Sequence, residues 1–269
     1  MVDVQNIKGD YNYKIDKVGI TNVIYPITLK NKQGMPVSTI GNLSMSVSLE
    51  QNLKGANMSR LPILLSEFGE NTWQLNDIKK DVKIFMLAMV EKMESKDGYL
   101  EMEFDFFVKK KAPISDFKGL MPYKCKISGS LHLEPSTEYD FIISVEVPVT
   151  TLCPCSKAIS EYSAHNQRGY VQVSLRYSDL LYIEDIIELV ESSASCEIYP
   201  ILKRVDEKYV TEKAYENPRF VEDMVRLVAE KLQHDDRVNW FSISSRHQES
   251  IHTHDAFATI EITKNNTNV

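Results

Sequence analysis

Residues 43–49 read Leu-Ser-Met-Ser-Val-Ser-Leu, so apolar and polar side chains alternate along this stretch. Such alternation is typical of a β-strand that has one buried face and one polar face. The same alternation occurs at Tyr11, Tyr13 and Ile15. The first third of the chain is therefore predicted to form strands of a sheet with one buried face.

Two helices are predicted after these strands, at residues 61–70 and 76–95. In the second, apolar side chains recur at helical spacing and form one stripe: Ile78, Val82, Phe85, Met86, Met89, Val90 and Met93. Strands resume at 99–108 and 123–133, and the polar segment Glu134-Pro135-Ser136-Thr137 interrupts the pattern. This break predicts two domains, residues 1–136 and 137–269.

The second half repeats the element order of the first. Strands are predicted at 139–149 and 169–177, helices at 183–193 and 218–233, and closing strands at 238–244 and 256–263. This order predicts an α+β fold of two ββααββ modules, in which helices cover one face of each antiparallel sheet. Subunits that close into barrels would cover the other face.

Composition excludes several classes of protein. The chain has 269 residues, 43% of them hydrophobic, which is too apolar for a disordered protein. Its net charge of −7 argues against a nucleic-acid partner. Apolar runs stay well short of the roughly 18 residues of a membrane span, and the first twenty residues lack the apolar centre of a signal peptide. Four cysteines are too few for disulfide bonds to stabilise a chain of this length, so a cytoplasmic location is predicted.

The segment 149–169 holds the densest group of residues that could ligate a metal or act as nucleophiles. Cys153 and Cys155 lie on a Pro-containing turn after a strand, and His165 follows a short helical stretch. A thiolate, an imidazole and a carboxylate from elsewhere would leave one metal position open for water, as in a hydrolytic metal site. Two alternatives remain open at this point, a turn with two small buried thiols and a Cys/His nucleophilic dyad.

A second polar segment, residues 244–255, holds His252 and His254. In extended backbone these two side chains point to the same side, which suits two proton-transfer groups or two ligands, although a polar hairpin loop would look similar. An acidic stretch that contains Glu207 is either solvated or supplies a metal ligand, and its sequence does not choose.

The helix at 218–233 has a well-formed predicted start. Asn217 is placed to cap it, with Pro218 at its first position. Glu222 lies off its apolar face, where it either pairs with Arg226 at helical spacing or has a functional role.

Taken together, the motifs resemble the type IB GTP cyclohydrolase family of the folate pathway. The resemblance is carried by PVTTLCPCSKAIS at 148–160, HNQRG at 165–169, NPRFVED at 217–223 and ESIHTHDA at 249–256, with KGANMSR at 54–60. It implies a tunnelling fold with two modules per chain, assembled into barrels in a homotetramer whose active sites lie between subunits. It also implies conversion of GTP and water to 7,8-dihydroneopterin triphosphate and formate, with a divalent zinc or manganese ion.

The resemblance also implies a role for individual residues. Cys153 and His165 match the metal ligands of the family, and Glu207 matches its carboxylate ligand. Glu222 matches the carboxylate that holds the purine edge, and His252 and His254 match the groups that handle protons. The cations nearest to these motifs are expected to hold the triphosphate: Lys54, Arg60, Arg168 and Arg246.

The chain departs from known patterns in two respects. The Cys-Glu-His-His signature of type IA cyclohydrolases is absent, and Asn57 stands where His is expected. The role of Cys155 and the identity of the metal stay open. Two other functions are kept as alternatives, a nitrile reductase of the queuosine pathway with the same fold, and a non-catalytic purine or pterin binder.

Overall fold

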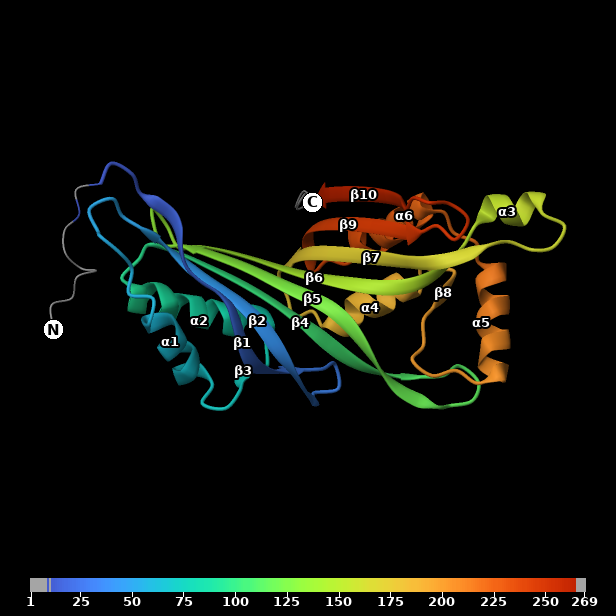
Figure 1. Cartoon of the computed structure of the whole chain (residues 1–269), viewed down its shortest axis with the longest axis horizontal. Coiled ribbons are helices and arrows are strands. Elements are labelled where there is room, and N and C mark those ends of the chain that lie inside the picture. The colour runs from blue at the N-terminus through green and yellow to red at the C-terminus, as the bar shows by residue number, and fades with distance from the viewer. Residues whose placement is uncertain (1–8, 10, 265–269) are drawn as a thin grey trace. The chain divides into compact units, whose positions relative to one another are not determined.

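The computed structural model describes Gly9 and residues 11–264 (Figure 1). Its elements follow the chain in this order: β1 (Ile15–Lys30), β2 (Pro36–Leu49), α1 (Arg60–Phe68), β3 (Trp73–Leu75), α2 (Ile78–Met93), β4 (Asp97–Lys111), β5 (Lys118–His132), β6 (Glu138–Leu152), α3 (Pro154–Ile159), β7 (Asn166–Tyr177), α4 (Ile183–Glu191), β8 (Cys196–Glu197), α5 (Arg204–Glu216), α6 (Val221–Gln233), β9 (Val238–Gln248) and β10 (Ala256–Thr263).

The strands form a single ten-stranded sheet with the order β10-β9-β7-β6-β5-β4-β2-β1-β3, and β8 pairs with β6 off this path. Most neighbouring strands whose pairing is described are antiparallel, but β1 and β3 are parallel. The predicted tunnelling fold of two ββααββ modules, with separate antiparallel sheets that assemble into barrels, is therefore wrong. The repeated order of elements suggested two separate sheets. The prediction failed because β4, β5 and β6 are strands of 15 residues each, too long to belong to separate small sheets.

The chain divides into two compact units that interleave along the sequence. One consists of residues 1–105 and 126–143, and the other of residues 106–125 and 144–269. The boundary expected between residues 136 and 137 falls within the second segment of the first unit. A division of the chain at that point stays a prediction.

In the first unit, α1 and α2 pack on one face of the sheet (Figure 1). The alternating stretch that ends β2 behaves as predicted, since Leu43, Met45 and Val47 are all buried. The predicted stripe of α2 faces the core, where the Phe85 ring lies 5.1 Å from that of Phe68 and 4.6 Å from that of Trp73. These apolar contacts position the helices on the sheet.

In the second unit, α6 packs on β9 and β10. The predicted start of this helix at Asn217 and Pro218 is wrong. The backbone N–H of Arg219 donates to the carbonyl of Leu152 at 3.0 Å, which holds this residue outside the helix. The helix begins at Val221 instead, and the Asp223 carboxylate accepts from the backbone N–H of Phe220 at 2.8 Å.

Helix α5 was not predicted. Its only buried residues are Asp206 and Ala214, so the helix has no apolar stripe that sequence periodicity would reveal. Asp206 anchors it, because its carboxylate accepts from the backbone N–H groups of Ile114 and Ser115 at 2.9 and 2.8 Å. Burial raises the pKa of Asp206, but hydrogen bonds from the Ser115 hydroxyl and from backbone N–H groups, these two among them, hold it well below its usual range.

A buried ion network lies near β8. Lys110 Nζ lies 2.7 Å from a carboxylate oxygen of Glu191 and 3.0 Å from one of Glu197. The Tyr123 hydroxyl also donates to Glu191, at 2.7 Å. Burial raises the pKa of Glu191, and the Lys110 charge opposes this shift.

Within the described residues, no helix is long and apolar enough to cross a membrane.

Replacing Lys110 by Ala is expected to destabilise the protein by about 3–5 kcal/mol, since two largely buried carboxylates lose their common cation. The neighbouring variant Lys111→Ala is the control. Lys111 pairs with Asp116 at the surface, where such pairs contribute at most about 1 kcal/mol. Urea unfolding of both variants tests this, and equal shifts of the two midpoints would contradict it.

Candidate active site

Cys153 is fixed at the junction of β6 and α3. It is the residue that caps α3, it is half-buried, and its Sγ accepts from the backbone N–H of Ser156 at 3.4 Å. Pro154 follows at the first helical position, where its missing N–H costs nothing. The preceding residue, Leu152, donates its N–H to the Ser195 hydroxyl at 3.0 Å. The sulfur is therefore held in a defined place at the start of a helix.

The backbone of His165 lies beside Cys153, whose N–H donates to the His165 carbonyl at 3.1 Å. His165 Nδ1 lies 3.0 Å from Gln167 Oε1 and 3.2 Å from Ser250 Oγ. Because an amide oxygen only accepts, Nδ1 carries the proton in this arrangement and Nε2 presents its lone pair. This orientation through a neighbouring acceptor is typical of histidines that bind a metal or a proton.

The contact of Ser250 with His165 ties the loop between β9 and β10 to the Cys153 region. In this loop the rings of His252 and His254 stack, with centroids 5.0 Å apart and planes 14° apart. Both side chains are exposed and lie on the same side, as the spacing predicts. An ion pair of 2.6 Å between Arg246 and Asp255 closes the base of the loop.

Glu222 lies in the first turn of α6 and is exposed. It acts electrostatically on His247, which is 1% exposed near the end of β9. Burial lowers the pKa of His247 to about 4, and the Glu222 charge opposes this shift. Glu222 therefore lies near the end of β9 that leads into the loop of His252 and His254.

The depressed pKa of His247 predicts an acid-sensitive fold. Above pH 6.5, the ordinary pKa of histidine, the buried neutral His247 contributes its full stabilisation to the folded protein. This contribution is lost as the pH falls toward about 4, because between these values the imidazole takes up a proton only in the unfolded protein. The expected loss is about 2–3 kcal/mol. Denaturant unfolding at pH 7 and pH 4.5 should show a smaller loss for His247→Leu than for the wild type. His234→Leu, which replaces an exposed histidine, is the control and should lose as much stability as the wild type. An identical loss in the wild type, His247→Leu and His234→Leu would contradict the assignment.

Glu207 does not form a metal-ligating group with Cys153 and His165 in the described structure. It is exposed at the start of α5, next to the anchored Asp206, whereas the other end of α5 contacts α3 through a 2.5 Å hydrogen bond from Lys157 Nζ to the Tyr215 carbonyl (Figure 1). Tyr215 is eight positions after Glu207 on this helix, about 12 Å along the axis. In residues 9 and 11–264, no three His, Cys, Asp or Glu side chains form a group that could hold a metal ion. The predicted donor set therefore fits a metal ion only in part.

Two of the predicted phosphate-binding cations, Arg60 and Arg246, have other partners in the structure. Arg60 donates to the Lys92 carbonyl at 2.8 Å and pairs with Glu94 at 2.9 Å, which stabilises the end of α2. Arg60 and Asn57 line a cavity of about 360 Å³ in the first unit. In the second unit, Arg246 pairs with Asp255 and also lies over the Tyr170 ring.

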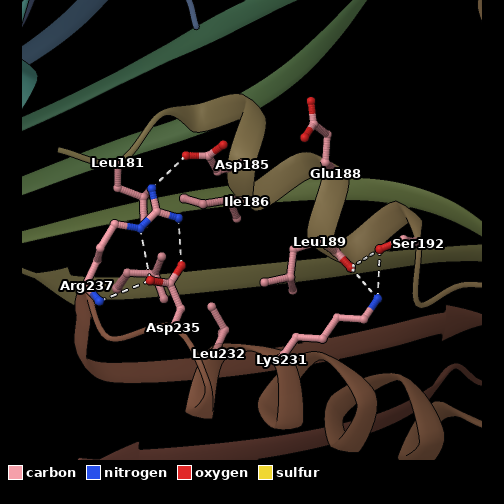
Figure 2. A pocket seen from close by; sticks show the side chains of 11 residues that line it. Leu181, Asp185, Ile186, Glu188, Leu189, Ser192, Lys231, Leu232, Asp235 and Arg237 are labelled. Atoms are coloured by element: carbon pink, nitrogen blue, oxygen red, sulfur yellow. Dashed lines mark hydrogen bonds and ion pairs between the residues drawn. The ribbon is translucent and has the colours of Figure 1, made fainter. Parts of the chain in front are cut away.

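A separate pocket of about 420 Å³ lies between α4 and α6 (Figure 2). Its charged groups bind one another: Arg237 bridges Asp185 and Asp235 at 3.1 and 2.7 Å. Lys231 donates to Ser192 at 2.7 Å. No residue of the Cys153 region lines this pocket, so it does not belong to the candidate site.

Several residues of the site escaped prediction. Gln167 and His247 are buried polar residues on strands, and Ser195 lies outside the quoted motifs. Gln167 and Ser250 lie within the motifs at 165–169 and 249–256 but were not singled out there. His247 had a signal in the periodicity of β9. It continues the two-residue alternation of the buried positions 241, 243 and 245, which marks it as facing the core.

Comparison with known proteins gives the family. The model of the type I GTP cyclohydrolase FolE2 family matches residues 1–258. The chain belongs to this family. FolE2 from Magnetococcus marinus is 44% identical over 96% of this chain and 95% of its own length. FolE2 from Syntrophobacter fumaroxidans is 42% identical over 98% of this chain and all of its own length. The predicted family resemblance is thus confirmed, and the chain is an enzyme of the FolE2 family.

Solved structures with a similar fold come from a different group of enzymes. A hyperthermostable mutant of urate oxidase from Bacillus sp. TB-90 gives a TM-score of 0.58 at 11% identity over 93% of this chain and the whole of the other. Urate oxidase from Bacillus subtilis 168 gives 0.55 at 7% identity over 92% of this chain and 98% of the other. At such identities the likeness concerns the fold of this FolE2 family member and not its chemistry.

Proposed function

We propose that this chain hydrolyses GTP to 7,8-dihydroneopterin triphosphate and formate, as the GTP cyclohydrolase of the folate pathway. Identity of 42–45% to FolE2 enzymes over nearly the whole chain carries this proposal. The geometry supports it, since Cys153, His165 and the loop of His252 are tied together by backbone and side-chain hydrogen bonds.

Glu222 is assigned to the guanine edge. A carboxylate accepts two hydrogen bonds side by side, and guanine offers its ring N–H and its amino group in that arrangement. Adenine lacks the ring N–H, so the same carboxylate would face a bare ring nitrogen. An exposed carboxylate on the first turn of a helix is free to make such contacts.

His252 and His254 are assigned to proton transfer during opening of the imidazole ring and release of formate. Opening the ring requires protonation of a ring nitrogen, and attack by water requires a base to take a proton. An imidazole serves either need near neutral pH. The stacked and exposed pair offers two such groups within one loop, which suits an acid and a base that act at the same substrate.

Cys153, His165 and Glu207 are proposed as ligands of a divalent ion, zinc or manganese. Such an ion would supply Lewis-acid chemistry at the bound substrate. Cys153 and the free Nε2 of His165 support the assignment, whereas the position of Glu207 on α5 does not. No step of the mechanism is therefore derived through the ion.

Arg60 and Arg246 are proposed to bind the triphosphate, each by exchanging its present carboxylate partner for phosphate oxygens. A homotetramer with active sites at subunit interfaces and a cytoplasmic location stay predictions. Light scattering tests the first, with an expected mass of four times the 30.9 kDa chain.

The test of function is a pair of incubations of the purified, metal-supplied protein. With GTP we expect one formate and one dihydroneopterin triphosphate per GTP consumed. With the nitrile substrate of queuosine biosynthesis and NADPH we expect no oxidation of NADPH. Oxidation of NADPH without formate from GTP would show a nitrile reductase, and binding of GTP without turnover in any metal would show a binding protein. Either result would overturn the proposal.

A further inference from the structure

A small polar layer lies under the start of α6, on a sheet face that is otherwise apolar. Its side chains are all buried and come from three adjacent strands: Thr151 on β6, Gln167 on β7, and Ser245 and His247 on β9. Gln167 contacts His165, and His247 is within electrostatic reach of Glu222. Members of the layer therefore reach both parts of the proposed active site, Gln167 at His165 and His247 at Glu222.

His247 is the central member of this layer. Its Nδ1 lies 3.3 Å from the Thr151 hydroxyl, whereas its Nε2 is buried and has no hydrogen-bond partner among the described residues. Leaving a buried polar atom without a partner costs about 1–3 kcal/mol, so an apolar side chain here would favour stability. A polar imidazole at this place indicates a partner in the working enzyme.

The backbone leaves room for this ring. Gly169 on β7 pairs with His247 on β9, and a Cβ at Gly169 would lie only 3.2 Å from Cδ2 and 3.4 Å from Nε2 of the imidazole. Glycine at position 169 thus leaves the space beside β7 that the ring occupies. Thr151 holds the ring at the opposite nitrogen, so the position of Nε2 is set from both sides.

We propose that His247 is a positioning residue for guanine recognition: Thr151 donates to its Nδ1, and its Nε2–H donates to the Glu222 carboxylate, which this contact turns toward the guanine edge in the GTP-bound enzyme. The negative charge of Glu222 favours the tautomer with the proton on Nε2, since that tautomer directs a donor at an acceptor. A hydrogen bond to one carboxylate oxygen leaves the remaining lone pairs of Glu222 for guanine. This inference rests on the proposed function, because it assigns a helper to its purine contact.

The test uses His247→Leu and His247→Gln, with GTP and inosine triphosphate as substrates. Inosine triphosphate lacks the guanine amino group but keeps the ring N–H. For His247→Leu we expect KM for GTP to rise about tenfold, kcat to change less than about threefold, and the preference for GTP over inosine triphosphate to shrink. His247→Gln, whose amide reaches the place of Nε2, should restore much of the preference. His234→Leu, an exposed histidine at the far end of α6, is the matched control.

An unchanged preference and KM in His247→Leu would overturn the inference, and so would equal losses for both nucleotides. If His247→Leu does not fold, Thr151→Val carries the same test, because it keeps the side-chain shape and removes only the hydroxyl that holds Nδ1. An unchanged preference in Thr151→Val then overturns the inference. The proposed function fails separately, if the wild type releases no formate from GTP.

Discussion

The variant Cys153→Ala is expected to lose GTP cyclohydrolase activity by about 10³-fold or more, because its sulfur is a proposed ligand or reacting group that the surrounding backbone holds in one place. Its sulfur sits at the start of α3 beside the backbone of His165, and no other residue that the structure describes can take that position. Formate release from GTP is the measurement. Bound metal should fall in the same variant, since soft thiolate ligands bind zinc tightly.

Cys155→Ala is the matched control for this variant. Cys155 lies two residues further along the same turn, but its side chain is exposed and it does not cap α3. We expect activity within about threefold of the wild type. Full activity of Cys153→Ala would show that its sulfur takes no part in the chemistry. Equal losses in both variants would show that the turn as a whole, and not the Cys153 sulfur in particular, is needed.

The second large effect is expected for Glu222→Ala. Loss of the carboxylate removes both hydrogen bonds to the guanine edge, and a buried substrate edge left without partners costs a factor of about 10³ or more in kcat/KM. Glu222→Gln should lose less, because its amide oxygen still accepts one of the two. Steady-state kinetics with GTP give these values, and competition with ATP shows whether the preference for guanine falls.

Glu230→Gln is the control for Glu222, since it changes an exposed carboxylate on the same helix two turns away. Its kinetics should match those of the wild type. If Glu222→Ala kept the kcat/KM of the wild type for GTP, Glu222 would be the surface half of a pair with Arg226, which is the other interpretation of its spacing.

Much of the fold could be predicted where periodicity is strong. Strand β10 runs over the predicted residues, and α2 differs from the predicted helix by two residues at each end. Helix α5 could not be predicted, because it is held by one buried carboxylate and not by an apolar stripe. The start of α6 was misplaced because the Asn-Pro pair at 217 and 218 is a strong local signal, whereas the opposing hydrogen bond to Leu152 joins residues far apart in sequence.

The candidate site shows the same limit. Motif spacing found Cys153, His165 and the stacked pair His252 and His254, which the structure ties into one region through Ser250. Thr151 was missed because its contact with His247 joins strands far apart in sequence and leaves no local signal. Gln167 lies only two residues after His165, but nothing in its motif marked it as the partner of that imidazole. Glu207 was taken from a family pattern alone, and it lies exposed on α5 beside Asp206, whose carboxylate anchors that helix.

Metal content and formate release, measured together on the same stripped and refilled protein, test the account most directly. The account predicts that the stripped protein is inactive, that one divalent ion per chain restores formate release from GTP, and that Cys153→Ala and His165→Ala recover neither metal nor activity. A stripped protein that releases formate at the full rate would contradict it.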